Sequence, residues 1–209
     1  MDRERRRAQF WEIACALNGQ AGLLKPLPPL FFVTDPKRTP DPAATAGRLP
    51  RGAGVIFRGF GAADAPEVGK ALRAACDRAG LLLLVGQDPE LALACGADGV
   101  HLPERALADA PALRRRRPDW RLTGAAHGAQ ALARAAGYGL DAALLSPVFE
   151  SASPSAGAAL GAAGFAALVA GAALPVYALG GVTDARAPEL LGSGAAGLAA
   201  VDAIVELFG

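Results

Sequence analysis

The chain has 209 residues, of which 52% are hydrophobic and 20% are charged, and its 21 Lys and Arg residues nearly balance 20 Asp and Glu residues. This composition is typical of a globular protein and excludes a disordered or collagen-like chain. The net charge near zero gives no overall field that would attract nucleic acid. A chain of this length can bury most of its surface around one core, so we expect a single domain.

Three features of the sequence indicate the compartment. The cysteines Cys15, Cys76 and Cys95 are odd in number and widely spaced, which predicts reduced thiols rather than disulfides or a metal site. The N-terminus is too charged for a secretory signal. No charged residue lies between Glu150 and Asp184, but this stretch is mainly Ala and Gly and is divided by prolines, which argues against a membrane span. We therefore expect a cytoplasmic protein with no membrane partner.

Short aliphatic runs alternate with Ala-, Leu- and Arg-rich stretches of helical period, the pattern of a parallel sheet built from βαβ units. An amphipathic helix is predicted over residues 1–18, where it would cap one end of the sheet structure. Asp88-Pro89 and Thr183-Asp184 mark helix starts, and Gly80 marks a helix end. The eight predicted strands are Leu30–Thr34, Gly54–Arg58, Leu81–Val85, Gly99–Leu102, Arg121–Gly124, Ala142–Ser146, Val176–Leu179 and Gly197–Val201.

The predicted strands start about 24 residues apart, which leaves room for a strand, a helix and two short loops in each repeat. Eight such repeats favour a closed (β/α)8 TIM barrel over an open doubly wound sheet. We expect this barrel over residues 27–209, preceded by an N-terminal helical extension over residues 1–26. In such a barrel the functional side chains lie where the strands end, at a single mouth.

Two glycine-containing segments are candidates for phosphate binding. The G-x-G-x-x-G match at residues 192–197 lies between a predicted helix and a strand, the reverse of a dinucleotide-binding motif, so we reject it. Gly180-Gly181 follows the predicted seventh strand and Val201-Asp202 follows the eighth, where barrels often bind a phosphate with backbone N–H groups. A plain turn that requires positive φ explains the glycine pair equally well.

The loop after the sixth strand, residues 146–157, carries hydroxyls that include Ser151 and Ser153. Such a loop can close over an anion, and the alternative is a flexible surface turn. The chain has only two histidines. His101 lies within the fourth strand and is expected to be a packed, hydrogen-bonded residue. His127 lies among small residues just past the fifth strand, so it is either a general acid/base or a surface histidine.

Several segments, in this order and spacing, resemble the thiamin-phosphate synthase family, including its thiazole tautomerase branch. The matching segments are Phe32-Val33-Thr34-Asp35, Gly96-Ala97-Asp98-Gly99-Val100-His101-Leu102, Ser146-Pro147-Val148-Phe149, Leu160-Gly161, Ala178-Leu179-Gly180-Gly181-Val182 and Gly194-Ala195-Ala196-Gly197. The resemblance implies a (β/α)8 barrel that, in synthases, joins a pyrimidine pyrophosphate to a thiazole phosphate with the help of Mg²⁺. It also implies a thiazole-phosphate site at Ser151, Ser153, Gly180, Gly181, Val201 and Asp202, with Asp202 at a position where a serine is usual.

The pyrophosphate half departs from the family pattern. The family's Q-x-R-x-K run reads Ile56-Phe57-Arg58-Gly59-Phe60 here, so Arg58 alone remains and a pyrophosphate is expected to meet a single arginine. Its asparagine and metal-binding aspartate fall on Gly86 and Gln87, its second metal aspartate on Ala106, its loop lysine on Pro154 and its serine on Ala125. Because Mg²⁺ prefers carboxylate and phosphate oxygens, Gln87 with Glu104 is a poor substitute, and we expect no metal site.

The resemblance therefore favours a metal-free tautomerase, in which His127 moves a proton on a small heterocyclic phosphate and Glu104 or Glu150 acts as its partner. The first alternative is a thiamin-phosphate synthase with a rebuilt pyrophosphate site, which would need Mg²⁺. The second is a binding protein without catalysis. The sequence leaves open whether the chain forms a homo-oligomer.

Overall fold

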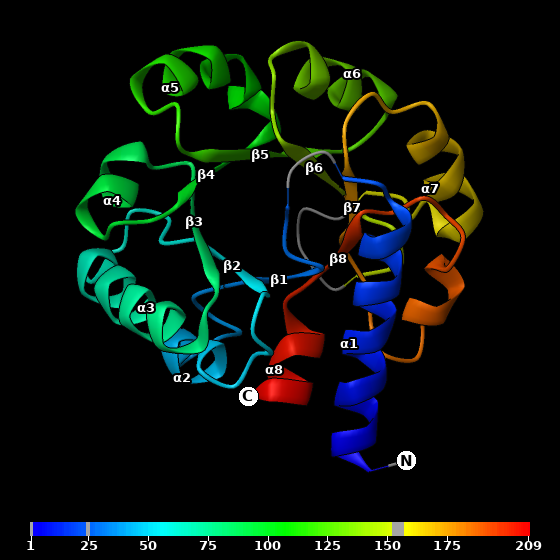
Figure 1. The fold of residues 1–209 in the computed structure, drawn as a ribbon, viewed down its shortest axis with the longest axis horizontal. Coiled ribbons are helices and arrows are strands. Elements are labelled where there is room, and N and C mark those ends of the chain that lie inside the picture. Colours follow the sequence, from blue (N-terminus) through cyan, green and yellow to red (C-terminus); the bar gives the residue numbers. More distant parts are fainter. Residues whose placement is uncertain (1, 24–25, 152–156) are drawn as a thin grey trace.

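The computed structural model describes residues 2–23, 26–151 and 157–209. Eight parallel strands close into a barrel in which each strand pairs with its neighbours in sequence and β1 pairs with β8. Figure 1 shows the helices arranged around the outside of this barrel. The predicted TIM barrel is confirmed. The strands are β1 (Leu30–Val33), β2 (Gly54–Phe57), β3 (Leu82–Gly86), β4 (Gly99–Leu102), β5 (Arg121–Ala126), β6 (Ala142–Leu145), β7 (Val176–Ala178) and β8 (Gly197–Ala200).

Most of the helices occupy the connections between strands. They are α1 (Arg3–Gln20), α2 (Pro42–Ala46), α3 (Ala65–Ala79), α4 (Pro89–Ala94), α5 (Ala110–Arg116), α6 (Ala129–Gly137), α7 (Gly161–Ala170) and α8 (Asp202–Phe208), with 3₁₀ helices η1 (Glu104–Asp109) and η2 (Ala187–Leu190). Two boundaries follow the predicted signals, since Asp88 caps α4 by accepting from the Leu91 N–H and Gly80 ends α3 in the left-handed conformation. The sequence predicts a helix after Thr183-Asp184, but only the short 3₁₀ helix η2 forms there. Gly192, two residues after the end of η2, has a positive φ, which does not continue a helix.

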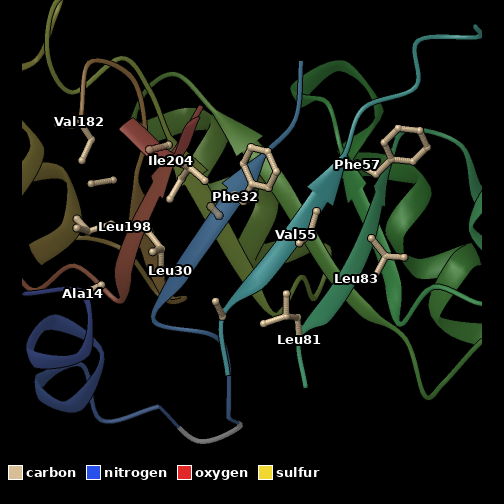
Figure 2. Close-up of a cluster of buried hydrophobic side chains, with 14 of the residues drawn as sticks. Ala14, Leu30, Phe32, Val55, Phe57, Leu81, Leu83, Val182, Leu198 and Ile204 are labelled. Carbon is tan, nitrogen blue, oxygen red and sulfur yellow. The ribbon is translucent and has the colours of Figure 1, made fainter. Parts of the chain in front are cut away.

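Successive side chains of each strand point alternately into the barrel and away from it, so the strands form two apolar layers, one inside the barrel and one between the barrel and the helices. In β1, Phe31 and Val33 point into the barrel, while Leu30 and Phe32 point outward. Figure 2 shows the outward-facing side chains of β1, β2, β3 and β8. The barrel interior is filled by Phe31, Val33, Ile56, Leu84, Ala142, Leu144, Tyr177, Ala196 and Ala199. A packed interior leaves the loops at the carboxyl ends of the strands as the place for a site.

The N-terminal helix α1 packs along the outside of the barrel beside α8, rather than capping its end as predicted (Figure 1). Its buried face, Phe10, Ile13, Ala14 and Leu17, repeats with helical spacing. A bidentate ion pair from Arg6 to Asp184, with Nε–Oδ2 at 2.7 Å, ties the helix to the loop after β7.

The segment that follows α1 takes the capping position. Leu27 belongs to the interior cluster, and the partly buried Ala21 and Leu23 pack against it. These contacts cross the boundary predicted between residues 26 and 27, and that boundary stays a prediction. Within the described ranges, no helix combines the length and apolar character needed to cross a bilayer.

Candidate functional site

A cavity of about 440 Å³ lies at the carboxyl ends of the strands. Its walls include seven of the residues predicted for the site, namely Arg58, His127, Ser151, Gly180, Gly181, Val201 and Asp202. Glu104 and Gln87 are not among the lining residues. Glu104 is hydrogen-bonded to His127, which lines the cavity, and the Gln87 side chain accepts a hydrogen bond from Arg105 in η1. Ser153 lies outside the described residues. The barrel thus brings Arg58 and Asp202, which are 144 positions apart, into one cavity.

His127 is held by a carboxylate at the rim of this cavity. Its Nδ1 lies 2.8 Å from Glu104 Oε2, and its backbone N–H donates to the same oxygen at 3.0 Å. Arg134 donates to the other carboxylate oxygen at 2.7 Å. Burial opposes ionisation of Glu104, but the hydrogen bonds from His127 and Arg134 outweigh it and lower the pKa of the carboxyl. An ionised Glu104 fixes the proton of His127 on Nδ1, so Nε2 is the ring nitrogen that can accept a proton.

The glycine pair after β7 supports the loop after β6. Both glycines have positive φ, +90° at Gly180 and +64° at Gly181, and a Cβ on Gly181 would lie 2.8 Å from the Phe149 backbone. The Phe149 N–H donates to the Gly180 carbonyl at 2.9 Å. Neither the Gly180 N–H nor the Gly181 N–H donates a hydrogen bond to any residue that the structure describes. Two backbone donors therefore remain for a ligand in this cavity.

Arg58 is anchored at the end of β2. Its Nε donates to the Thr34 carbonyl at 2.7 Å, and its Nη2 lies 3.2 Å from Asp35 Oδ2. Burial lowers the pKa of Arg58, and the charge of Asp35 partly offsets this effect. Its guanidinium remains charged under physiological conditions and supplies a fixed cation to the cavity wall.

Two more arginines line the cavity, and the sequence reasoning missed both. Arg38, in the loop after β1, bonds to Asp202 at 3.0 Å and to Asp35 at 3.3 Å. Arg186, after β7, stacks over the Phe149 ring with its Cζ 3.8 Å from the ring centroid. The sequence predicts that a pyrophosphate meets a single arginine, whereas three arginines line this cavity, because the closed barrel brings the loops after β1, β2 and β7 to one mouth.

His101 is a hydrogen-bonded strand residue, as expected, but its ring also forms part of the cavity floor. Its Nδ1 lies 2.9 Å from Thr123 Oγ1 on β5. Burial, aided by the charge of Arg58, lowers the pKa of His101 to about 4. The imidazole is therefore neutral near pH 7 and acts as a hydrogen-bonding group.

The carboxylates at the mouth do not form a site for Mg²⁺, the ion that synthases of the resembled family use. Within residues 2–23, 26–151 and 157–209, no three His, Cys, Asp or Glu side chains are placed to hold a metal ion. Three carboxylates near the cavity already bind a cation, since Asp35 binds Arg38 and Arg58, Asp202 binds Arg38, and Glu104 binds Arg134, and Glu150 also lines the cavity. The oxygen donors present here do not fit Mg²⁺.

Comparison with known proteins identifies the family. The sequence model of the family described as "Thiamine monophosphate synthase" matches residues 30–204. The chain belongs to this family. Among its relatives, a "Putative thiamine-phosphate synthase" of Geobacter sulfurreducens is 40% identical over 141 residues, which are 66% of each chain. A "Thiamine-phosphate synthase" of Methanoculleus marisnigri is 39% identical over 137 residues, 65% of this chain and 64% of the relative.

A solved structure, a "Thiamine phosphate pyrophosphorylase" from Pyrococcus furiosus, shares the fold of this thiamin-phosphate synthase family member. Its TM-score is 0.72 at 23% identity, covering 85% of this chain and 92% of that one. The chain spans about two thirds of the length of the curated relatives quoted above. The resemblance drawn from the sequence motifs is confirmed, and the relatives' names refer to enzymes of thiamin biosynthesis.

Proposed function

We propose that this family member binds a thiazole phosphate or a similar small heterocyclic phosphate and transfers a proton on it through His127. The observation that carries the proposal is the His127–Glu104 pair, whose histidine lines a cavity that Gly180, Gly181 and Val201 also line. The pair supplies an oriented acid/base, and the loops supply donors for an anion. Neither function requires a metal ion.

The proposed phosphate position lies between the loops after β7 and β8. The N–H groups of Gly180 and Gly181 are donors there, and α8 starts beside them at Asp202. Asp202 would repel a phosphate, but Arg38 bonds to its carboxylate at 3.0 Å and offsets that charge. Arg186 adds a cation on the same side of the cavity. A phosphate here would anchor the substrate and hold its ring near His127.

The proton transfer follows from the chemistry of a non-aromatic tautomer. Such a ring carries a proton on a saturated ring carbon and a double bond to a carbon outside the ring. His127 Nε2 would remove the ring proton, the electron pair would shift to form the aromatic ring, and the exocyclic carbon would receive a proton from the same imidazole. Glu104 would stabilise the intermediate imidazolium through Nδ1, at 2.8 Å.

The test is to follow aromatisation of the thiazole phosphate tautomer with the chelator EDTA present. The wild type should turn over, and His127→Ala should lower the rate by about 10²-fold or more while still binding inorganic phosphate. His101→Asn is the comparison variant: it removes the other histidine of the cavity but leaves the His127–Glu104 pair, so its rate should stay well above that of His127→Ala. Equal rates in the wild type and His127→Ala would contradict the proposal.

Condensation of a thiazole phosphate with a pyrimidine pyrophosphate is the second candidate. The relatives' names favour it over a tautomerase, since both refer to thiamine-phosphate synthase. Arg38, Arg58 and Arg186 on the cavity wall also give a diphosphate more positive charge than the sequence predicts. The mismatch between the mouth carboxylates and Mg²⁺ argues against it.

The synthase candidate has a separate signature. It predicts that thiamin phosphate forms from the two substrates, that EDTA abolishes the reaction, and that Arg58→Ala removes it. If neither condensation nor aromatisation occurs while the thiazole phosphate binds tightly, the chain is a binding protein.

A further inference from the structure

Phe60 is an exposed aromatic residue in the loop after β2, and no packing of the fold explains it. Its side chain is 69% exposed, the largest value among the large hydrophobic residues of the described chain, whereas the other phenylalanines named in the two apolar clusters are buried. Exposing a phenylalanine forgoes the stabilisation that burial of its ring would give. An exposed ring that contacts a cavity-lining residue, Arg58, is therefore a candidate contact for a ligand.

The backbone at Phe60 is held in a conformation that a bulky residue rarely adopts. Its φ is +48°, and in the described ranges Gln87 is the one other non-glycine residue with positive φ. Gln87 has hydrogen bonds in place, from its N–H to the His101 carbonyl and from Arg105 to its side chain. Phe60 has instead a projecting ring. Strained residues of this kind concentrate where a side chain must face a ligand.

Packing around the loop keeps Phe60 in this position. Gly59 fits tightly against α3, since a Cβ there would lie 3.0 Å from the Ala65 Cβ, and the Ala62 N–H closes the turn onto the Gly59 carbonyl at 2.9 Å. Gly61 has a φ of +74° and faces open space. The loop is therefore fixed at its base, and the ring projects from its tip.

The ring also stacks on a residue of the cavity wall. The Phe60 centroid lies 5.3 Å from the Arg58 Cζ, within the range of a cation–π contact. Arg58 itself is fixed by Thr34 and Asp35 and lines the cavity, on the β2 side rather than the β7–β8 side. The Phe60 ring thus lies against Arg58, next to the residues that line the cavity.

We propose that Phe60 is a specificity-determining residue that stacks on the five-membered heterocycle of the thiazole phosphate. This inference rests on the proposed function, which places a heterocyclic phosphate in the cavity, and it adds the group that recognises the ring. The Arg58–Phe60 pair offers a planar π-face beside a guanidinium, a surface that suits a flat heterocyclic ring.

The test compares two probes by calorimetry, a thiazole phosphate and inorganic phosphate, on the full chain. Phe60→Gly should weaken the thiazole phosphate by about 3- to 10-fold and leave inorganic phosphate unchanged. Because glycine relieves the positive φ, the thermal midpoint should not fall, so lost affinity cannot come from misfolding. Phe60→Trp should keep the wild-type affinity for the thiazole phosphate. Phe60→Leu, which keeps apolar bulk without a π-face, should bind the thiazole phosphate nearly as weakly as Phe60→Gly does.

Leu191→Ala is the control, since Leu191 is also exposed, 47%, but, unlike Phe60, it stacks on no arginine of the cavity wall, and its affinities should equal those of the wild type. The proposal is overturned if Phe60→Gly binds thiazole phosphate as the wild type does, if both probes weaken equally, or if the wild type binds thiazole phosphate no better than inorganic phosphate. Failure of the proposed function differs: His127→Ala would turn over normally while Phe60→Gly still weakened the thiazole phosphate.

Discussion

The buried imidazole of His101 makes the stability of the fold depend on pH in a range where few other groups titrate. Its pKa of about 4 in the folded chain lies below the ordinary value of 6.5. As the pH falls from 7 to 5, the unfolded chain takes up a proton at this residue and the folded chain does not. The unfolded state is therefore favoured, and the free energy of unfolding should fall by about 2 kcal/mol from this residue. The loss should continue until the pH reaches the folded pKa.

Urea unfolding at pH 7 and pH 5 measures this effect. His101→Asn keeps a polar partner for Thr123 but cannot titrate, so its free energy of unfolding should change much less between the two pH values than that of the wild type. His127→Asn is the matched control, because the chain has only two histidines, and it should retain the loss that His101 causes. The same loss in His101→Asn as in the wild type would show that the imidazole at the cavity floor is not held neutral by burial.

Three further substitutions test the geometry of the mouth. Gly181→Ala should destabilise the chain by about 2 kcal/mol or more, because a Cβ collides with the loop after β6 at a φ of +64°, while Gly137→Ala, with open space at its Cβ, should be tolerated in thermal denaturation. Glu104→Gln should lower the aromatisation rate about 10-fold near pH 7. Because the folded chain lowers the pKa of the Glu104 carboxyl from 4.5, this carboxylate stabilises the fold above pH 4.5, and that stabilisation is lost as the pH falls below 4.5. Arg38→Ala should weaken phosphate binding about 5-fold by leaving Asp202 uncompensated, whereas the double variant with Asp202→Ser should restore it.

The barrel could be predicted because its signals are local. Eight aliphatic runs at regular spacing, with Asp88 before a helix and Gly80 after one, are readable along the chain and agree with the structure. The position of α1 could not be predicted, because it depends on contacts between distant residues: the apolar face of α1 packs into the outer core, and Arg6 pairs with Asp184 and Glu206, 178 and 200 positions away.

The site was predicted less completely than the fold. His127 and Glu104 could be found because both directly follow strands, and the resemblance supplied a role for the histidine. Arg38 and Arg186 were missed because they lie several residues beyond β1 and β7, where the sequence does not indicate whether a side chain turns towards the mouth. A search for every cation within eight residues after a strand would have found both.

The most direct test of the account is solvent deuterium incorporation during aromatisation of the thiazole phosphate tautomer, followed by NMR in D₂O with EDTA and no pyrimidine substrate. Because the His127 side chain is half exposed, its imidazolium can exchange with solvent before it returns a proton, so we expect deuterium on the exocyclic carbon of the product with the wild type and a rate at least about 10²-fold lower with His127→Ala. Product that forms only when Mg²⁺ and a pyrimidine pyrophosphate are added, and then as thiamin phosphate, would contradict the proposed proton transfer and establish the synthase.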